Sequence, residues 1–214
     1  MNSALAKRAD RVLMNTYGPR KLAFVRGRGA WAWDSAGKKY LDLLGGVAVN
    51  ALGHSHPAVV RAIKMQSGKI LHTSNLYLIE PQVCLAEKLV RSTFADRVFF
   101  CNSGTEANEA AVKLARKYFF QKSDRRQSRP GRDGLLSFMN SFHGRTLGSL
   151  SLTAQHKYQN AFRPLLSVDT ARFNDLADAE KKITPRTAAV FVELVQGEGG
   201  METATPTFLA GLRR

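Results

Sequence analysis

The stretch VFFCNSGTEANEAAVKLARKYFF, residues 98–120, decides the fold because three patterns follow one another within it. Its first four residues are apolar, with β-branched and aromatic side chains, and they predict a buried parallel strand over 97–101. Small and polar residues follow at 102–105. From Ala107 onward, good helix formers place apolar side chains along one face, which predicts a helix that reaches Phe120. A strand, a polar turn and a helix in this order indicate an α/β fold.

The polar turn therefore lies at the N-terminus of a helix. Backbone N–H groups in the first turn lack partners within the helix, and the helix dipole adds partial positive charge there. Gly104 permits close backbone approach, and Ser103 and Thr105 add hydroxyl donors, so the turn suits a phosphate group. A second interpretation needs no ligand, because Ser103 and Glu106 have the spacing of a capping box. These residues alone leave both interpretations open.

Composition and charge narrow the class of protein. The chain has 214 residues, of which 44% are hydrophobic, and this suffices for a sizeable core. A formal net charge of +15 raises nucleic acid as a partner, and a non-catalytic basic nucleic-acid-binding protein is the alternative of a different class. The basic residues are spread along the chain, however. The densest cluster, 122–132, also contains Asp124, a proline and a glycine, and Asp133 follows it, which predicts a solvated loop, so we do not expect nucleic acid as a partner.

Other signals for location, redox state and metal binding are weak. No stretch approaches the roughly 20 apolar residues that span a bilayer, and the N-terminus lacks a secretory signal, so we expect a cytoplasmic protein. Cys84 and Cys101 lie in apolar contexts, and we expect buried, reduced thiols. His54 and His56 flank a serine without a nearby third ligand, so no metal site is expected.

The two sides of the central stretch differ in pattern. Residues 1–50 predict a helix and then short strands separated by glycine-containing turns, which is typical of an antiparallel meander. Beyond residue 51 the patterns predict helices that alternate with apolar strands, and helical crossovers make such strands parallel. The expected helices are 4–15, 58–67, 81–91, about 175–182 and 206–214, and the expected strands are 22–25, 30–34, 39–43, 135–139 and 188–192.

The segment SGTEANEAAVKLARK, residues 103–117, resembles the phosphate-binding segment of class III pyridoxal-phosphate aminotransferases. GGVAVNALGHSHP at 45–57 and SFHGRT at 141–146 resemble two further motifs of that family, and together they place the chain near its acetylornithine aminotransferase branch. The resemblance implies a fold-type-I transferase. Residues 1–50 would form part of the small domain, and residues 51–214 the first part of the large, cofactor-binding domain, with a mostly parallel sheet.

The resemblance also implies roles for individual residues. The turn at 103–105 would hold the phosphate of pyridoxal 5′-phosphate, and Phe142 would stack on its ring, as suits an aromatic face. Arg145 would bind a substrate carboxylate, which matches its guanidinium fork. Glu193 would lie near the cofactor. Glu198 would face an active-site arginine when no α-carboxylate occupies it.

The resemblance stops short of a complete active site. Leu194 stands where the family's motif has proline. The family's aspartate at the ring nitrogen and its Schiff-base lysine would both fall after Arg214, so we expect roughly the first half of an aminotransferase, without a catalytic residue and inactive alone. The implied reaction moves the δ-amino group of N-acetylornithine to 2-oxoglutarate in arginine biosynthesis. The implied assembly is a homodimer, because residues 71–77 resemble the family's subunit-interface loop. Succinylornithine, ornithine and 4-aminobutyrate stay open as amino donors.

Overall fold

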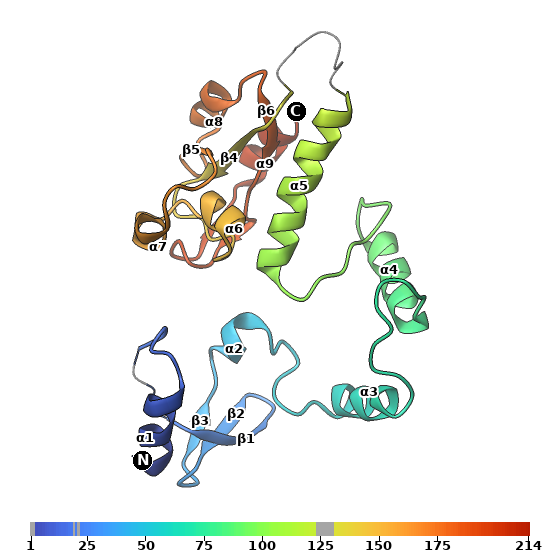
Figure 1. The fold of residues 1–214 in the computed structure, drawn as a ribbon, viewed down its shortest axis with the longest axis vertical. Helices are drawn as coiled ribbons and strands as arrows, with labels where there is room; N and C mark the ends of the chain where they lie inside the picture. The colour runs from blue at the N-terminus through green and yellow to red at the C-terminus, as the bar shows by residue number, and fades with distance from the viewer. Residues whose placement is uncertain (1–2, 19, 21, 123–130) are drawn as a thin grey trace. The chain divides into compact units, whose positions relative to one another are not determined.

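The computed structural model describes residues 3–18, 20, 22–122 and 131–214 (Figure 1). The chain divides into two compact units, Met1–Phe94 and Ala95–Arg214. The division at residue 50 expected from the sequence falls inside the first unit. The assignment of 1–50 to a small domain and of 51–214 to a large one stays a prediction. Most of the basic cluster at 122–132 lies outside the described residues.

In the first unit, an antiparallel meander is present as predicted. Its strands pair in the order β1-β2-β3, and Asp34 closes the turn between β2 and β3 by accepting hydrogen bonds from the N–H groups of Ala36 and Lys38, both at 2.9 Å. The helix expected over 4–15 ends three residues earlier. The elements of this unit are α1 (Ser3–Val12), β1 (Phe24–Arg28), β2 (Trp31–Asp34), β3 (Lys39–Leu41), α2 (Gly45–Ala48), α3 (Pro57–Ser67) and α4 (Glu80–Ser92).

In the second unit, a parallel sheet has β4 at its centre, with β5 and β6 on either side. The expected strands 135–139 and 188–192 correspond to β4 and β6, so their parallel pairing is confirmed. The sequence did not indicate β5 or the β7–β8 hairpin. The elements are α5 (Gly104–Lys122), β4 (Gly134–Phe138), α6 (Leu147–Leu152), α7 (His156–Gln159), a 3₁₀ turn η1 (Asn160–Phe162), β5 (Asp169–Ala171), α8 (Leu176–Lys182), β6 (Thr187–Val190), β7 (Val195–Gln196), β8 (Glu202–Thr203) and α9 (Pro206–Arg213).

Two apolar clusters cover the two faces of this sheet, since successive side chains of a strand point to opposite faces. Leu136 and Phe138 of β4 pack with residues of α8 and α9, including Ala179 and Phe208. Leu135 packs instead with Val112 of α5 and residues of α6 and β6. Helices therefore cover both faces, which explains why all residues of β4 from Leu135 to Phe138 are buried. The C-terminal end of β4 and the N-terminus of α5 carry the candidate site.

Two expectations about this region are wrong. Residues 97–101 form no strand, and no residue in the described ranges pairs with them. Without a ladder partner the segment is not covered, and Phe99 is 68% exposed. Cys84 and Cys101 are exposed rather than buried. An apolar neighbourhood in sequence buries a thiol only where another element packs on it, and α4 contains no buried residue.

Candidate functional site

The first turn of α5 combines a side-chain cap with free backbone donors. The Ser103 hydroxyl donates to Glu106 Oε2 at 2.8 Å and accepts the Glu106 N–H at 3.3 Å, so the capping-box interpretation is correct. Hydrogen bonds from Ser103, and then from Asn102, lower the pKa of Glu106. The N–H groups of Gly104 and Thr105 have no acceptor in the part of the chain that the structure describes. The cap and an anion site are therefore compatible.

Gly104 leaves open space in front of these donors. A Cβ added to Gly104 would meet no atom within 4 Å, so no contact within the described chain requires glycine there. A side chain at this position would project into space that a ligand approaching the helix terminus would need. The absence of a side chain thus fits a bound phosphate better than it fits packing.

The loop after β4 carries the second group of expected residues. The ring of Phe142 is half-buried and meets Tyr158 edge to face, with centroids 5.8 Å apart. The guanidinium of Arg145 lies 4.7 Å from the Tyr158 ring centroid and 6.0 Å from that of Phe142. Arg145 is exposed, and no carboxylate among the described residues forms an ion pair with it. It can therefore accept a substrate carboxylate, and Tyr158 is a neighbour that the sequence did not indicate.

The structure places the first turn of α5 against the loop after β4, although about 40 residues separate them in the sequence. Thr105 Oγ1 lies 2.9 Å from Thr146 Oγ1, and Asn108 Nδ2 donates to the carbonyl of His143 at 2.7 Å. Gly144 has φ +129°, and a Cβ there would lie 2.3 Å from Thr105 Oγ1. Only glycine permits this approach. The turn at 103–105 and the loop with Phe142 and Arg145 thus form one surface.

The hydroxyl of Thr105 serves this contact rather than an outside ligand. Thr146 donates its hydroxyl hydrogen to the carboxylate of Glu109, which in its ionised form can only accept. In the contact between the two threonines, Thr105 is then the donor. The Ser103 hydroxyl is committed to Glu106 in the same way. A phosphate at this turn would be held by the backbone N–H groups that the sequence also predicted, without the additional hydroxyl donors of Ser103 and Thr105.

His143 lies beneath the loop. Its side chain is buried, with 7% exposure, and its ring centroid is 6.1 Å from that of Phe191. Burial lowers the pKa of His143 to about 4, so the imidazole is neutral near pH 7.

Glu193 joins the site from the end of β6. Its Oε2 accepts the N–H of Phe142 at 3.3 Å. Burial raises the pKa of Glu193, and the charge of Glu198 raises it further, whereas the hydrogen bond from Phe142 lowers it. Glu198 is exposed, and no other described residue holds it by a hydrogen bond, although its charge acts on Glu193. Leu194, which replaces the family's proline, is 66% exposed.

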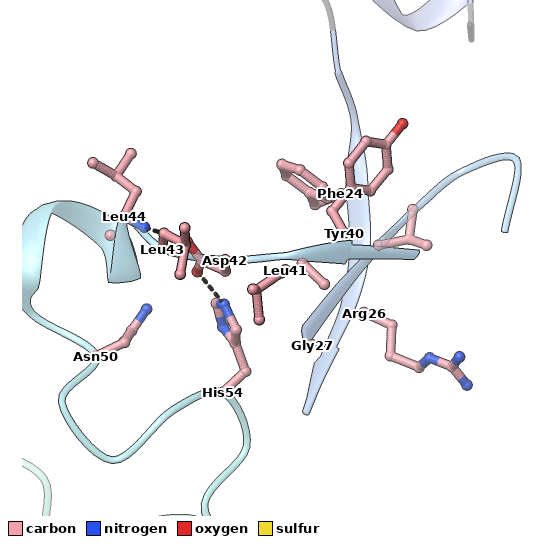
Figure 2. Close-up of a pocket in the computed structure, with 13 residues that line it drawn as sticks. Phe24, Arg26, Gly27, Tyr40, Leu41, Asp42, Leu43, Leu44, Asn50 and His54 are labelled. Atoms are coloured by element: carbon pink, nitrogen blue, oxygen red, sulfur yellow. Dashed lines mark hydrogen bonds and ion pairs between the residues drawn. The ribbon is translucent and has the colours of Figure 1, made fainter. Parts of the chain in front are cut away.

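A separate cavity of about 810 Å³ lies in the first unit, mostly between apolar side chains of the meander and residues 43–54 (Figure 2). On its wall, Asp42 accepts the N–H groups of Leu44 and Gly45 at 3.0 and 2.9 Å, and His54 Nε2 lies 2.6 Å from Asp42 Oδ2. These bonds, from Gly45 first and then His54, lower the pKa of Asp42. His54 is thus engaged by a carboxylate, and no group of three metal-ligating residues occurs within the described ranges.

Comparison with known proteins identifies the family. A sequence model described as Aminotransferase class-III matches residues 13–214. The chain belongs to the class III aminotransferases. This membership implies pyridoxal 5′-phosphate as the cofactor. The free N–H groups at Gly104 and Thr105, the open space at Gly104 and the half-exposed ring of Phe142 fit a phosphate and a flat ring.

Individual relatives agree with the family. A succinylornithine transaminase of Yersinia enterocolitica is 50% identical over 209 residues, which cover 95% of this chain and 50% of that protein. The ornithine aminotransferase of Toxoplasma gondii superposes with a TM-score of 0.90 at 26% identity, over 100% of this chain and 50% of that one. An N-acetylornithine aminotransferase from Stenotrophomonas maltophilia superposes with a TM-score of 0.74 at 38% identity, over 93% of this chain and 48% of that one.

These matches confirm the fold predicted from the sequence, which is the first part of a fold-type-I transferase. The class III aminotransferase chain spans about half the length of the curated relatives it matches. None of its described helices is both long and apolar enough to cross a membrane.

Proposed function

We propose that this chain supplies the cofactor-phosphate turn and the substrate-carboxylate arginine of an aminotransferase that acts on an N-acylated ornithine. The reaction would move the δ-amino group of N-acetylornithine to 2-oxoglutarate. The contact of the α5 terminus with the Phe142–Arg145 loop supports this proposal, because it joins an anion site, an aromatic face and a free guanidinium on one surface. Succinylornithine is the second candidate donor, since the relative at 50% identity is a succinylornithine transaminase.

The residues of this chain would bind and orient the reactants. The N–H groups of Gly104 and Thr105 would hold the cofactor phosphate, aided by the helix dipole. Phe142 would stack on the ring, and Glu193 would fix the backbone of Phe142 through the 3.3 Å hydrogen bond. Bound pyridoxal phosphate supplies an electron sink for the substrate carbon.

Arg145 would grip the α-carboxylate of the amino donor. Tyr158, 4.7 Å below the guanidinium, restricts where that guanidinium can lie and so presents it for a two-point contact. Glu198 would form an ion pair with an active-site arginine when no α-carboxylate is bound. The Schiff-base lysine and the aspartate on the ring nitrogen would come from sequence beyond Arg214.

Assembly and setting remain predictions from the family resemblance. We infer a homodimer in the cytoplasm that serves arginine biosynthesis. The 71–77 segment, which resembles a subunit-interface loop, supports the dimer. Light scattering on the purified protein would test it.

The experiment uses the complete gene product. Its cofactor content would be measured from visible absorbance before and after borohydride reduction, and kcat/KM compared for N-acetylornithine, succinylornithine, ornithine and 4-aminobutyrate with 2-oxoglutarate. We expect bound cofactor and the highest value with an N-acylated ornithine. Protein that carries no pyridoxal phosphate and aminates 2-oxoglutarate from none of these donors would refute the proposal.

A further inference from the structure

Glu109 lies in the second turn of α5, four residues after Thr105, so the two side chains share one face of the helix. The Oε1 atom of Glu109 accepts three hydrogen bonds from one short segment. Two come from the N–H groups of Gly148 and Ser149, at 3.0 and 3.1 Å, and the third comes from the hydroxyl of Thr146. A single carboxylate oxygen therefore holds the start of another helix.

That helix, α6, has no cap of its own. The side chain of its N-cap residue, Thr146, makes no capping hydrogen bond to α6. The first N–H groups of a helix need acceptors from elsewhere, and a carboxylate there is also favoured by the helix dipole. Glu109 fills this role from α5, which contacts α6 (Figure 1). A Cβ on Gly148 would lie 2.3 Å from Glu109 Oε2, so the carboxylate fits only against glycine.

Three more bonds join the same two helices. Thr105 Oγ1 bonds to Thr146 Oγ1 at 2.9 Å and accepts the Thr146 N–H at 3.4 Å, and Ser149 Oγ donates to the Thr105 carbonyl at 2.9 Å. Arg145 directly precedes Thr146 in the chain. The position of the guanidinium relative to the phosphate-binding turn therefore depends on where α6 begins.

We propose that Glu109 is a positioning residue of the aminotransferase site, which fixes the Phe142–Arg145 loop against the phosphate-binding turn by capping α6. The proposal rests on the proposed function. Glu109 itself touches neither cofactor nor substrate. Its loss shifts the groups that bind them, and displacement of a binding group by about 1 Å can cost about a hundredfold. The effect falls on cofactor and substrate affinity, because ground-state binding is what these groups provide.

The test compares variants of the complete gene product. Glu109→Ala removes the acceptor, whereas Glu109→Gln keeps an oxygen at the same place. Thr146→Val removes only one of the three hydrogen-bond donors to Glu109, and it tests the same contact if Glu109→Ala does not fold. Asp175→Ala is the matched control, because Asp175 caps α8 by accepting the Asp178 N–H at 2.9 Å, away from the site. Glu180→Ala is a second control, on an exposed helical position.

Two quantities are measured: the dissociation constant of pyridoxal phosphate from apoprotein, and KM for the amino donor. In Glu109→Ala we expect both to rise about tenfold or more, with recovery to within about threefold of the parent in Glu109→Gln. In Thr146→Val we expect both constants to lie between those of Glu109→Gln and Glu109→Ala, and in both controls we expect the parental values. Glu109→Ala or Thr146→Val with parental values, or an equal rise in Asp175→Ala, would overturn the proposal. A parent that binds no pyridoxal phosphate would instead refute the proposed function.

Discussion

Gly144→Ala tests the close contact between the loop after β4 and the first turn of α5. The backbone at Gly144 has φ +129°, which side-chain-bearing residues rarely adopt. The new Cβ would lie 2.3 Å from Thr105 Oγ1, 2.7 Å from Thr105 Cβ and 2.9 Å from Ser149 Cβ. Since Thr105 Cβ is held by the helix backbone, the side chain cannot simply rotate away.

The magnitude follows from two costs. Backbone strain at such a position is about 1–3 kcal/mol, and overpacking of a filled site adds about 1–3 kcal/mol. We expect Gly144→Ala to lower the free energy of unfolding by about 2–6 kcal/mol. Urea unfolding of the complete protein, followed by circular dichroism, gives the midpoint and slope that measure it.

Gly197→Ala is the control for this measurement. No atom lies within 4 Å of a Cβ at Gly197, and its φ is not in the positive region. We expect a change within about 0.5 kcal/mol. If Gly144→Ala unfolds at the parental midpoint with the parental slope, the loop does not pack on Thr105 and the site is not assembled as described.

Three further predictions concern charge and binding. Gly104→Asp should leave the free energy of unfolding equal or slightly raised, because an acid suits the first turn of a helix, and urea midpoints measure this effect. The same variant should lower the affinity for pyridoxal phosphate at least about tenfold, because the new carboxylate repels the phosphate. Unchanged affinity in a cofactor titration would contradict the phosphate site. Arg145→Ala should raise KM for the amino donor about tenfold to a hundredfold and leave cofactor affinity unchanged. An unchanged KM in steady-state kinetics with N-acetylornithine would show that the guanidinium binds no substrate carboxylate. The third prediction concerns His143, whose pKa is lowered from 6.5 to about 4 by burial, so that it stays neutral in the native state while the unfolded chain takes up a proton. It therefore reduces stability as pH falls from 6.5 to 4, by about 3 kcal/mol at most. His143→Gln should flatten this part of the stability–pH curve, and equal curves for parent and variant would show that His143 is not buried as a neutral ring.

Local chemistry was readable from the sequence wherever neighbours in the chain supply it. Ser103 and Glu106 form the capping box that their spacing predicts, and Asp175 and Thr205 cap their helices by accepting hydrogen bonds from Asp178 and Phe208. Helix ends satisfy their own orphan N–H groups within three residues, so a short window of sequence contains both partners.

Strands and long-range contacts were less readable, because the partner that decides them lies elsewhere. The run at 98–101 has strand character, but pairing needs a neighbour, and no described residue provides one. β5, Asp169–Ala171, is only three residues long and forms because β4 offers it a parallel edge. The stacking of Tyr158 on Arg145 likewise depends on how α7 folds back, which no local pattern indicates.

At the site, side chains hold the structural elements together, and backbone N–H groups stay available for an anion. Ser103, Thr105 and Glu109 use their polar side-chain atoms on other parts of the protein, and together they hold α5, its cap and α6 in place. The donors left for an outside anion are main-chain N–H groups, whose direction is fixed by the helix itself. Main-chain donors lose no side-chain entropy on binding, so a phosphate would meet an already ordered site. Substitutions of Ser103, Thr105 or Glu109 should therefore act on the cofactor through the geometry of the turn, whereas a side chain added at Gly104 acts directly on the bound phosphate.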